Sequence, residues 1–342
     1  MHLLLASLST AIAAPVLVID DTDTDTLTFK STLETEYGHS VSLTSDFGVV
    51  EWEFEGDTTA PTGEVLKLED FDVIVWFDGG PAAGISMPSA GQDALLEYVS
   101  NGGSLMLFGQ NGYNFNTGRH AGMAPMIPLR SWTTFEGGSI ICDDDDHPIC
   151  DEFGADEFII SGGYLSTSIL AADTYATRLF GYKPWWVPEF VFTRMGSAHL
   201  NYGLGSALQW GLWGNSTSSS LQSPWWDSDV MELMNLSVEW LTQDRPPVAD
   251  AGGPYTGTAG ELIELSAAAS RARGSAELEA FRWDIGSVDI VEADDPIIDF
   301  DSRVLDGPTV VAINLQIEDS EGRTANASTT LTVENADPIF EE

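Results

Sequence analysis

Both cysteines of the 342-residue chain lie in one short stretch, ICDDDDHPIC, at residues 141–150. Three kinds of chemistry fit it: a thiol nucleophile with His147 as base, a divalent-ion site on the four aspartates, or a disulfide. Four neighbouring aspartates disfavour a thiolate, and a zinc site needs more Cys or His than this region offers. We therefore expect a Cys142–Cys150 disulfide, with a divalent-ion site on residues 143–146 as the alternative.

A second acidic cluster, DDTDTDT, follows the first predicted strand. Asp21, Asp23 and Asp25 have the spacing of the first three ligands of a Ca²⁺ loop. Thr26 and Thr32 stand where an EF-hand requires glycine and glutamate, so this motif is excluded. An aspartate that caps the following helix is the interpretation we favour, with a metal or substrate site as the alternative.

Polar residues also follow the later strands, and they would meet if these strands are parallel. Asp20, Asp78, Gln110 and Asn111 would converge at the carboxyl edge of an open α/β sheet, where ligands bind. His199, after another predicted strand, could join them. Such a group of residues suits a polar ligand such as a sugar. The alternatives are ordinary loop polarity, or a hydrolase that uses Asp20, Asp78 and His199 as acid and base.

Two tryptophan pairs offer a further means of binding sugar rings. Trp185 and Trp186 lie in KPWWVPEF, and a second pair lies in SPWWDSD. Exposed indole faces stack on sugars, whereas buried pairs cover a core or a seam between domains. The sequence leaves both roles open.

The elements that must position these residues alternate between strand and helix. The apolar runs PVLVIDD, HSVSLT, FDVIVWFDG and SLMLFG predict strands, and EFVFTR and ALQWGLW predict later ones. TLTFKSTLETEYG, GQDALLEYVSNGG and DVMELMNLSVEWL predict helices, the last with Asp227 or Asp229 as N-cap. Residues 111–182 are expected to form loops and short strands. The pattern predicts a doubly wound, flavodoxin-like α/β fold with a parallel sheet.

The pattern changes at TQDRPPVADAGGPYTG, residues 242–257, where prolines and glycines end the last helix. Short runs of period 2 follow: ELIELSA, EAFRWDIG, TVVAINLQIED and ASTTLTVEN. These predict an all-β sandwich of about 90 residues. We expect a signal peptide at 1–13, an α/β domain at 14–243, a sandwich at 244–337 and a tail at 338–342.

The net charge and the N-terminal segment indicate where the protein is located and which partners it can bind. Lysine and arginine number 13 against 54 aspartates and glutamates, which gives a net charge of −41. This surface repels nucleic acid and anionic lipid and attracts cations. The start, MHLLLASLSTAIAAP, is typical of a short secretory signal that ends in a small-x-small site at Ala11-Ile12-Ala13; a lead into the first strand is the alternative. We expect export, with no transmembrane span.

The second domain resembles PKD domains, a family of immunoglobulin-like modules. The resemblance rests on PPVADAGGPYTGTAGELIELSAAAS, FRWDIG and LQIEDSEGRTANASTTLTVEN. It implies an extracellular spacer, adhesion or surface-binding module. Some PKD domains bind Ca²⁺, and Asp244 and Asp319 match two of the ligand positions. Ala272 or Arg273 occupies the third and supplies no carboxylate, so Ca²⁺ is only a candidate cofactor.

The first domain resembles the class I glutamine amidotransferase-like superfamily, nearest its ThuA-like members. FDVIVWFDG, LLEYVSNGGSLMLFG, HPI and LMNLSVEWL carry this resemblance, and ThuA-like proteins have a histidine placed like His199. In catalytic members a cysteine sits on the turn after the GGSLMLF strand. Here the turn at residues 109–112 reads GQNG, without a nucleophile. The resemblance therefore does not extend to thioester chemistry.

The sequence as a whole favours an exported, non-catalytic protein whose α/β head binds an extracellular glycan, a protein or cations. A secreted hydrolase directed at sugars or amides, with acid and base residues at the sheet edge, is one alternative. A Ca²⁺-dependent adhesion or assembly protein, suggested by the charge of −41, is the other.

Overall fold

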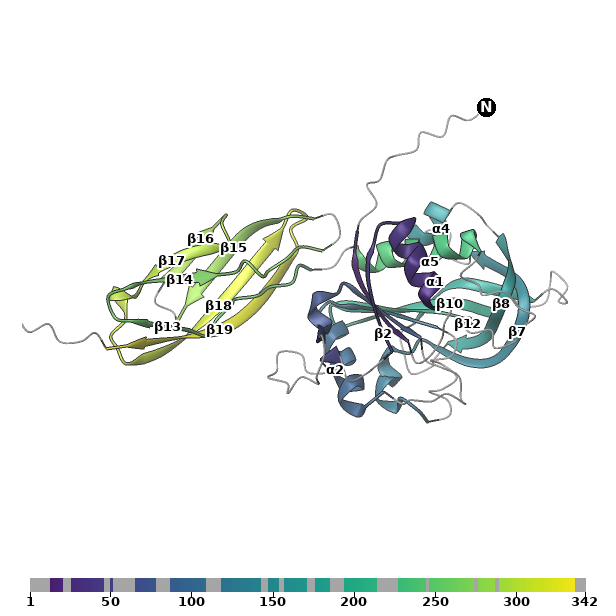
Figure 1. Cartoon of the computed structure of the whole chain (residues 1–342), viewed down its shortest axis with the longest axis horizontal. Helices are drawn as coiled ribbons and strands as arrows, with labels where there is room; N and C mark the ends of the chain where they lie inside the picture. Colours follow the sequence, from purple (N-terminus) through teal and green to yellow (C-terminus); the bar gives the residue numbers. More distant parts are fainter. Residues whose placement is uncertain are drawn as a thin grey trace, which may run out of the picture. The chain divides into compact units, whose positions relative to one another are not determined.

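The chain forms two compact units, Met1–Gln243 and Asp244–Glu342, in a computed structural model (Figure 1). The structure describes residues 13–20, 26–45, 50–51, 65–77, 87–108, 118–142, 147–153, 157–170, 176–184, 194–213, 227–243, 246–273, 276–286 and 289–335. Each unit has its own apolar core, and each is described by itself.

The first unit is built on a ten-stranded sheet with the order β12-β8-β7-β9-β10-β11-β6-β5-β1-β2. From β11 to β2 the neighbouring strands pair in parallel: β11 (Gly205–Trp210), β6 (Ser104–Leu107), β5 (Val73–Phe77), β1 (Pro15–Asp20) and β2 (Ser40–Thr44). The other strands pair in antiparallel fashion: β7 (Leu129–Cys142), β8 (Glu157–Leu170), β9 (Thr177–Pro184), β10 (Arg194–Tyr202) and β12 (Leu212–Trp213). Two short strands, β3 (Val50–Glu51) and β4 (Leu66–Lys67), pair separately.

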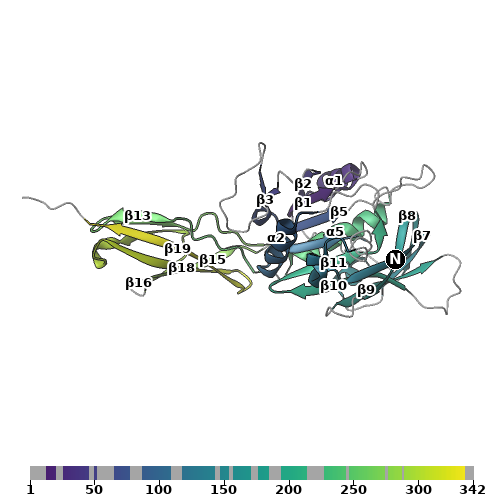
Figure 2. The ribbon, with the colours of Figure 1, turned by 90° about the horizontal axis from the view of Figure 1, so that it is seen from below.

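Helices cover both faces of this sheet (Figures 1 and 2). One face carries α1 (Thr26–Thr35), α4 (Pro148–Phe153) and α5 (Ser228–Thr242). The other carries α2 (Ser89–Ser100) with the 3₁₀ turns η2 (Leu68–Asp70) and η3 (Ala121–Met126). Strand β1 contributes side chains to the core on both faces of the sheet, because alternate residues of a strand point to opposite faces. Val16 and Val18 pack in the α1/α5 layer, and Leu17 and Ile19 pack in the α2 layer.

With the exception of EFVFTR, the helices and strands expected on either side of residues 111–182 are confirmed. Asp227 is the N-cap of α5, because its carboxylate accepts the Asp229 N–H at 3.0 Å. Most of the predicted strand EFVFTR lies outside the described residues, and its last residue, Arg194, begins β10.

The expectation of loops and short strands at residues 111–182 is wrong. Strands β7 and β8 are 14 residues each and pair as a long hairpin. Their sequences are rich in glycine, serine and threonine (FEGGSII, ISGGYLSTSI), so no apolar alternation marks them. Pairing with neighbouring strands, which local sequence does not encode, determines their structure.

A line of buried and partly buried hydrogen bonds connects the start of β1 to α5. The Ala14 N–H donates to His39 Nδ1 at 3.2 Å, so the ring is neutral with its proton on Nε2. Nε2 donates to Asn235 Oδ1 at 2.8 Å, and Asn235 Nδ2 donates to Glu239 Oε1 at 3.2 Å. Burial lowers the pKa of His39. It raises the pKa of Glu239, and the nearby Glu152 carboxylate adds to that rise. We call Ala14, His39, Asn235 and Glu239 the relay.

The relay predicts that the first unit loses stability in mild acid. Unfolded His39 takes up a proton near pH 6.5, whereas the folded ring has a lower pKa. Its contribution is therefore complete above pH 6.5 and is lost as the pH falls through the folded value. Glu239 changes the stability in the opposite direction. Because its pKa is raised in the folded state, it stabilises the fold in acid, and this contribution is lost as the pH rises above 4.5 through the folded pKa. We expect the melting temperature to fall from pH 7 to pH 5, and to fall less in His39→Gln; calorimetry of both chains measures this. The same slope of melting temperature against pH in both chains would contradict this prediction.

The second unit is a β-sandwich with a five-stranded sheet, β13-β19-β18-β15-β16, and a two-stranded sheet, β14-β17. Its elements are β13 (Tyr255–Thr258), β14 (Leu262–Ser266), β15 (Leu278–Ile285), β16 (Asp289–Ala293), β17 (Ile297–Asp301), η5 (Ser302–Val304), β18 (Thr309–Asp319) and β19 (Thr324–Glu334). The four strands expected here are confirmed as β14, β15, β18 and β19. Trp283, Phe300 and Leu315 lie in the core between the sheets. Throughout the described part of the chain, no helix has the length and apolarity to cross a bilayer.

Candidate functional site

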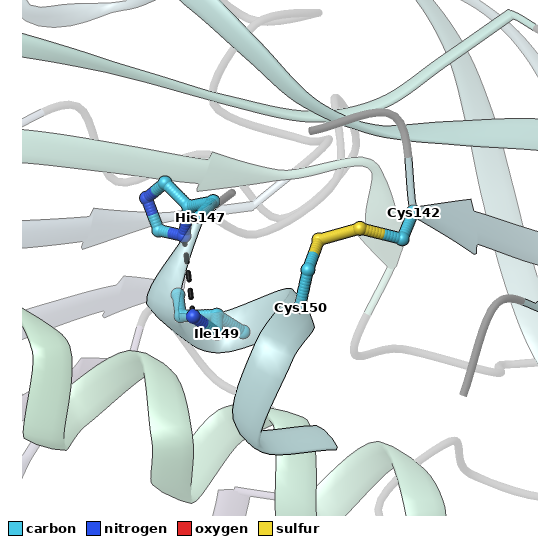
Figure 3. Close-up of a disulfide and its surroundings, with 4 residues drawn as sticks. All are labelled: Cys142, His147, Ile149 and Cys150. Carbon is cyan, nitrogen blue, oxygen red and sulfur yellow. Dashed lines mark hydrogen bonds between the residues drawn. A yellow bond between two sulfur atoms is a disulfide. The ribbon is translucent and has the colours of Figure 1, made fainter. Parts of the chain in front are cut away.

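The disulfide expected at ICDDDDHPIC is confirmed (Figure 3). Cys142 is the last residue of β7 and Cys150 lies in α4, with their Cα atoms 5.9 Å apart. Because these are the only cysteines of the chain, no free thiol remains. The four aspartates between them lie outside the described residues, but the bridge closes them covalently into a short ring.

His147, inside this ring, organises the start of α4. Its carbonyl accepts the N–H groups of Cys150 at 2.9 Å and Asp151 at 3.0 Å. Its ring nitrogen Nδ1 accepts the N–H of Ile149 at 3.2 Å, as the dashed line in Figure 3 marks. These bonds satisfy N–H groups of the first helical turn. His147 is 7 % exposed and therefore has a fixed ring orientation.

Three rings from distant parts of the sequence meet beside this turn. His147 lies before α4, His199 on β10 and Trp240 on α5. The ring centroids are 5.2 Å apart for the two histidines, 4.8 Å for His147 and Trp240, and 5.1 Å for His199 and Trp240. His199 and Trp240 are half-buried. We call this group the ring cluster. Imidazoles can donate, accept or transfer protons, and an indole face binds sugar rings and cations.

The ring cluster gives His199 neighbours that the sequence did not suggest, and one suggested neighbour, Asp20, lies far away. Asp20 ends β1, and His199 lies on β10, with β11, β6 and β5 between these strands. Four strand spacings of ~4.8 Å separate the two residues by about 19 Å. The structure therefore does not bring Asp20 and His199 together, because the β10–β11 hairpin extends the sheet away from β1.

Most other predicted site residues lie outside the described part of the chain. They are Asp21, Asp23, Asp25, Asp78, Gln110, Asn111, Trp185, Trp186 and Asp244. The strands that lead to the edge are described: β1, β5 and β6 are adjacent and parallel, and they end at Asp20, Phe77 and Leu107. The segments that carry Asp78 and Gln110 thus leave from neighbouring strands at one edge.

Asp319, the described member of the proposed Ca²⁺ pair, already has a cationic partner. Its side chain is fully buried and accepts Arg323 Nε at 2.8 Å. It also accepts the N–H groups of Glu321 at 3.1 Å and Arg323 at 2.9 Å. A Ca²⁺ ion would have to displace this guanidinium. Within the described ranges, no three His, Cys, Asp or Glu side chains are grouped to hold a metal.

Little in the sequence indicates the ring cluster. The HPI turn and His199 each stand out in the sequence, but no sequence pattern predicts that they meet. Trp240 lay within the predicted closing helix, in LMNLSVEWL. Only the β10–β11 hairpin and the packing of α4 near α5 bring the three rings together.

Comparisons with known proteins found similar solved structures but no matching family model. No protein-family model matches the chain, and no curated protein matches it. A ThuA-like protein from Parabacteroides merdae is similar over 68 % of this chain and 93 % of its own, with 14 % identity and a TM-score of 0.50. The PKD1 domain of Vibrio anguillarum Epp matches 27 % of this chain and 96 % of its own, with 21 % identity and a TM-score of 0.21. A structure of carbohydrate-binding modules from the β-sandwich superfamily matches 28 % of this chain at 19 % identity and a TM-score of 0.25, and this chain spans 36 % of its length.

The first of these likenesses agrees with the fold of the first unit, a parallel-rich α/β sheet with helices on both faces. The second unit is a mostly antiparallel β-sandwich by its own strand pairing, with β13 and β19 paired in parallel. At these identities the comparisons concern fold alone.

Proposed function

We propose that this chain is an exported binding protein whose α/β head holds its ligand without cysteine chemistry. The observation that carries the proposal is the Cys142–Cys150 bridge, which uses both thiols of the chain. A thioester mechanism needs a free thiolate, and a disulfide sulfur is not one. A structural disulfide also fits an oxidising, extracytoplasmic compartment, in agreement with the signal-like N-terminus.

The ligand we favour is a neutral extracellular glycan. A chain with charge −41 repels polyanions, which disfavours nucleic acid and acidic polysaccharides. The ring cluster combines an indole with two imidazoles, a set that suits the apolar face and the hydroxyl groups of a sugar. The amides at Gln110 and Asn111 and the indoles at Trp185 and Trp186 would add donors and stacking surface.

A second candidate, a hydrolase, is favoured by one observation. Two imidazoles with ring centroids 5.2 Å apart can share acid and base roles. In this form of the hydrolase, His147 and His199 act as the pair, and the distant Asp20 takes no part.

Glycan-array binding of the full chain, followed by titration calorimetry on each hit, tests both candidates. We expect at least one neutral glycan to bind, and His199→Gln or the Trp185→Ala/Trp186→Ala pair to weaken it about tenfold, since each removes a hydrogen bond or a stacking surface worth ~1.4 kcal/mol. His120→Gln is the matched control, because His120 is 3 % exposed and lies in the α2 layer against Trp76. New reducing ends that disappear in His199→Gln would establish the hydrolase instead. Unchanged binding in both variants would refute this site.

A further inference from the structure

The relay at the start of β1 has a direction. Each hydrogen bond points from Ala14 toward Glu239: amide to imidazole, imidazole to carboxamide, carboxamide to carboxylate. The accepting end therefore carries a charge, whereas the donating end is a neutral backbone N–H. Hydrogen bonds are strongest when donor and acceptor are both charged. The geometry would suit a cation at Ala14.

The structure and the sequence both identify the Ala13–Ala14 peptide bond as the place where the folded unit begins. Ala14 is 1 % exposed and Ala13 is exposed. The regular fold begins at Ala14, because its carbonyl accepts the Ser40 N–H at 3.0 Å and the Pro15 carbonyl accepts the Asp72 N–H at 2.9 Å. The small-x-small pattern at residues 11–13 independently predicts cleavage after Ala13.

We propose that cleavage after Ala13 turns the Ala14 amide into an ammonium group, which becomes the charged donor of the relay to His39 Nδ1. The step is hydrolysis by the signal peptidase of the export machinery: water adds its oxygen to the Ala13 carbonyl carbon, the C–N bond breaks, and the released amine takes a proton. The inference rests on the proposed export. Its consequence is that the mature N-terminus is docked to α5 through His39 and Asn235.

The surroundings of the relay favour this positive charge. Tyr37, two residues before His39, has its pKa raised to about 12 by burial and then by nearby carboxylates, those of Glu232, Glu36, Asp229 and Glu239. On α1, the cation Lys30 already donates to Glu34 and to the Val41 carbonyl. The new ammonium would be only partly desolvated. Ala13 is exposed, so its removal leaves that side of the ammonium in contact with water. Carboxylates close to the relay stabilise an added cation.

The first measurement is the N-terminus of the full chain, expressed with its own leader in a secretory host, by intact mass and terminal sequencing. We expect the exported chain to begin at Ala14. Exported protein that begins elsewhere would overturn the inference and leave the proposed export standing. Protein retained in the cytoplasm with Met1 would overturn both.

The second measurement is the rate at which an acylating ester modifies the Ala14 amine of the folded mature chain near neutral pH. The reagent attacks the lone pair of the neutral amine, which an ammonium held by His39 lacks. We expect about tenfold faster modification in His39→Ala than in wild type, which corresponds to ~1.4 kcal/mol. The three lysines leave few competing amines for peptide mapping.

Matched variants separate this role from general stability. His120→Ala removes a comparable buried contact, the acceptance of the Met87 N–H by Nε2 at 3.0 Å, and should leave the rate unchanged. Glu239→Gln keeps an acceptor for Asn235 but removes the charge, and should raise the rate about threefold even if His39→Ala fails to fold. Equal rates in wild type and Glu239→Gln would overturn the proposal.

Discussion

Replacing Asp319 by alanine is expected to destabilise the second unit by about 3 kcal/mol, because it removes the fully buried carboxylate that pairs with Arg323 and leaves that guanidinium only its exposed partner Glu321. Arg323 is 17 % exposed, and its Nε lies 2.8 Å from Asp319 Oδ2. The same carboxylate holds the turn between β18 and β19 through the N–H groups of Glu321 and Arg323. Differential scanning calorimetry of the full chain should show the transition of the second unit shifted downward.

The exposed pair Asp301–Arg303 provides the matched control. In this pair, too, an arginine Nε donates to an aspartate, but both side chains are in contact with solvent. Asp301→Ala should shift the transition much less, since solvent and salt screen exposed pairs and the variant otherwise loses only the N-cap of η5. We also expect Ca²⁺, added after EDTA at constant ionic strength, to leave the wild-type midpoint unchanged, because Arg323 already satisfies Asp319. A Ca²⁺-induced rise in that midpoint, or equal effects of both aspartate variants, would contradict this account.

Replacing both cysteines by serine is expected to lower the stability of the first unit by about 2.5 kcal/mol. A bridge across eight positions restricts the unfolded chain by roughly this amount. The loss should be larger at low ionic strength, because the ring also holds four adjacent aspartates whose mutual repulsion salt screens. Denaturant titrations of the oxidised chain and the double variant, at low and high salt, measure both effects.

Reduction of the wild-type chain should reproduce the double variant, and the serine chain should not respond to reductant. A reduced chain as stable as the oxidised one would show that β7 and α4 are held together without the bridge. The second unit contains no cysteine, so its transition serves as an internal reference.

Where the local sequence carries the information, it predicted the structure. The apolar runs of β1, β5 and β6 and the helical spacing of Phe29 and Leu33 identify elements whose burial is set by their own residues. The disulfide was predictable because two cysteines eight positions apart leave few other arrangements. Strands β7 and β8 were not, since long-range pairing rather than composition makes them strands.

The buried polar contacts could not be predicted from the sequence for a related reason. His39 and Asn235 are 196 positions apart, and each would pass for an ordinary polar residue in its own segment. The ring cluster likewise joins a turn, a strand and a helix from three separate regions. Contacts of this kind depend on topology, and one sequence without its fold does not specify them.

Helix α5 has a consequence for how the first unit is made. It is the final element of that unit, and it supplies partners to earlier ones: Asn235 to His39, Ser237 to Trp210 at 3.1 Å, and the Leu241 carbonyl to Ser104 at 2.7 Å. During synthesis these hydrogen bonds cannot all form until Leu241 has been added to the chain. The nascent head is thus kept from closing early, which suits the export proposed above, because a chain that crosses a membrane in extended form would fold only afterwards.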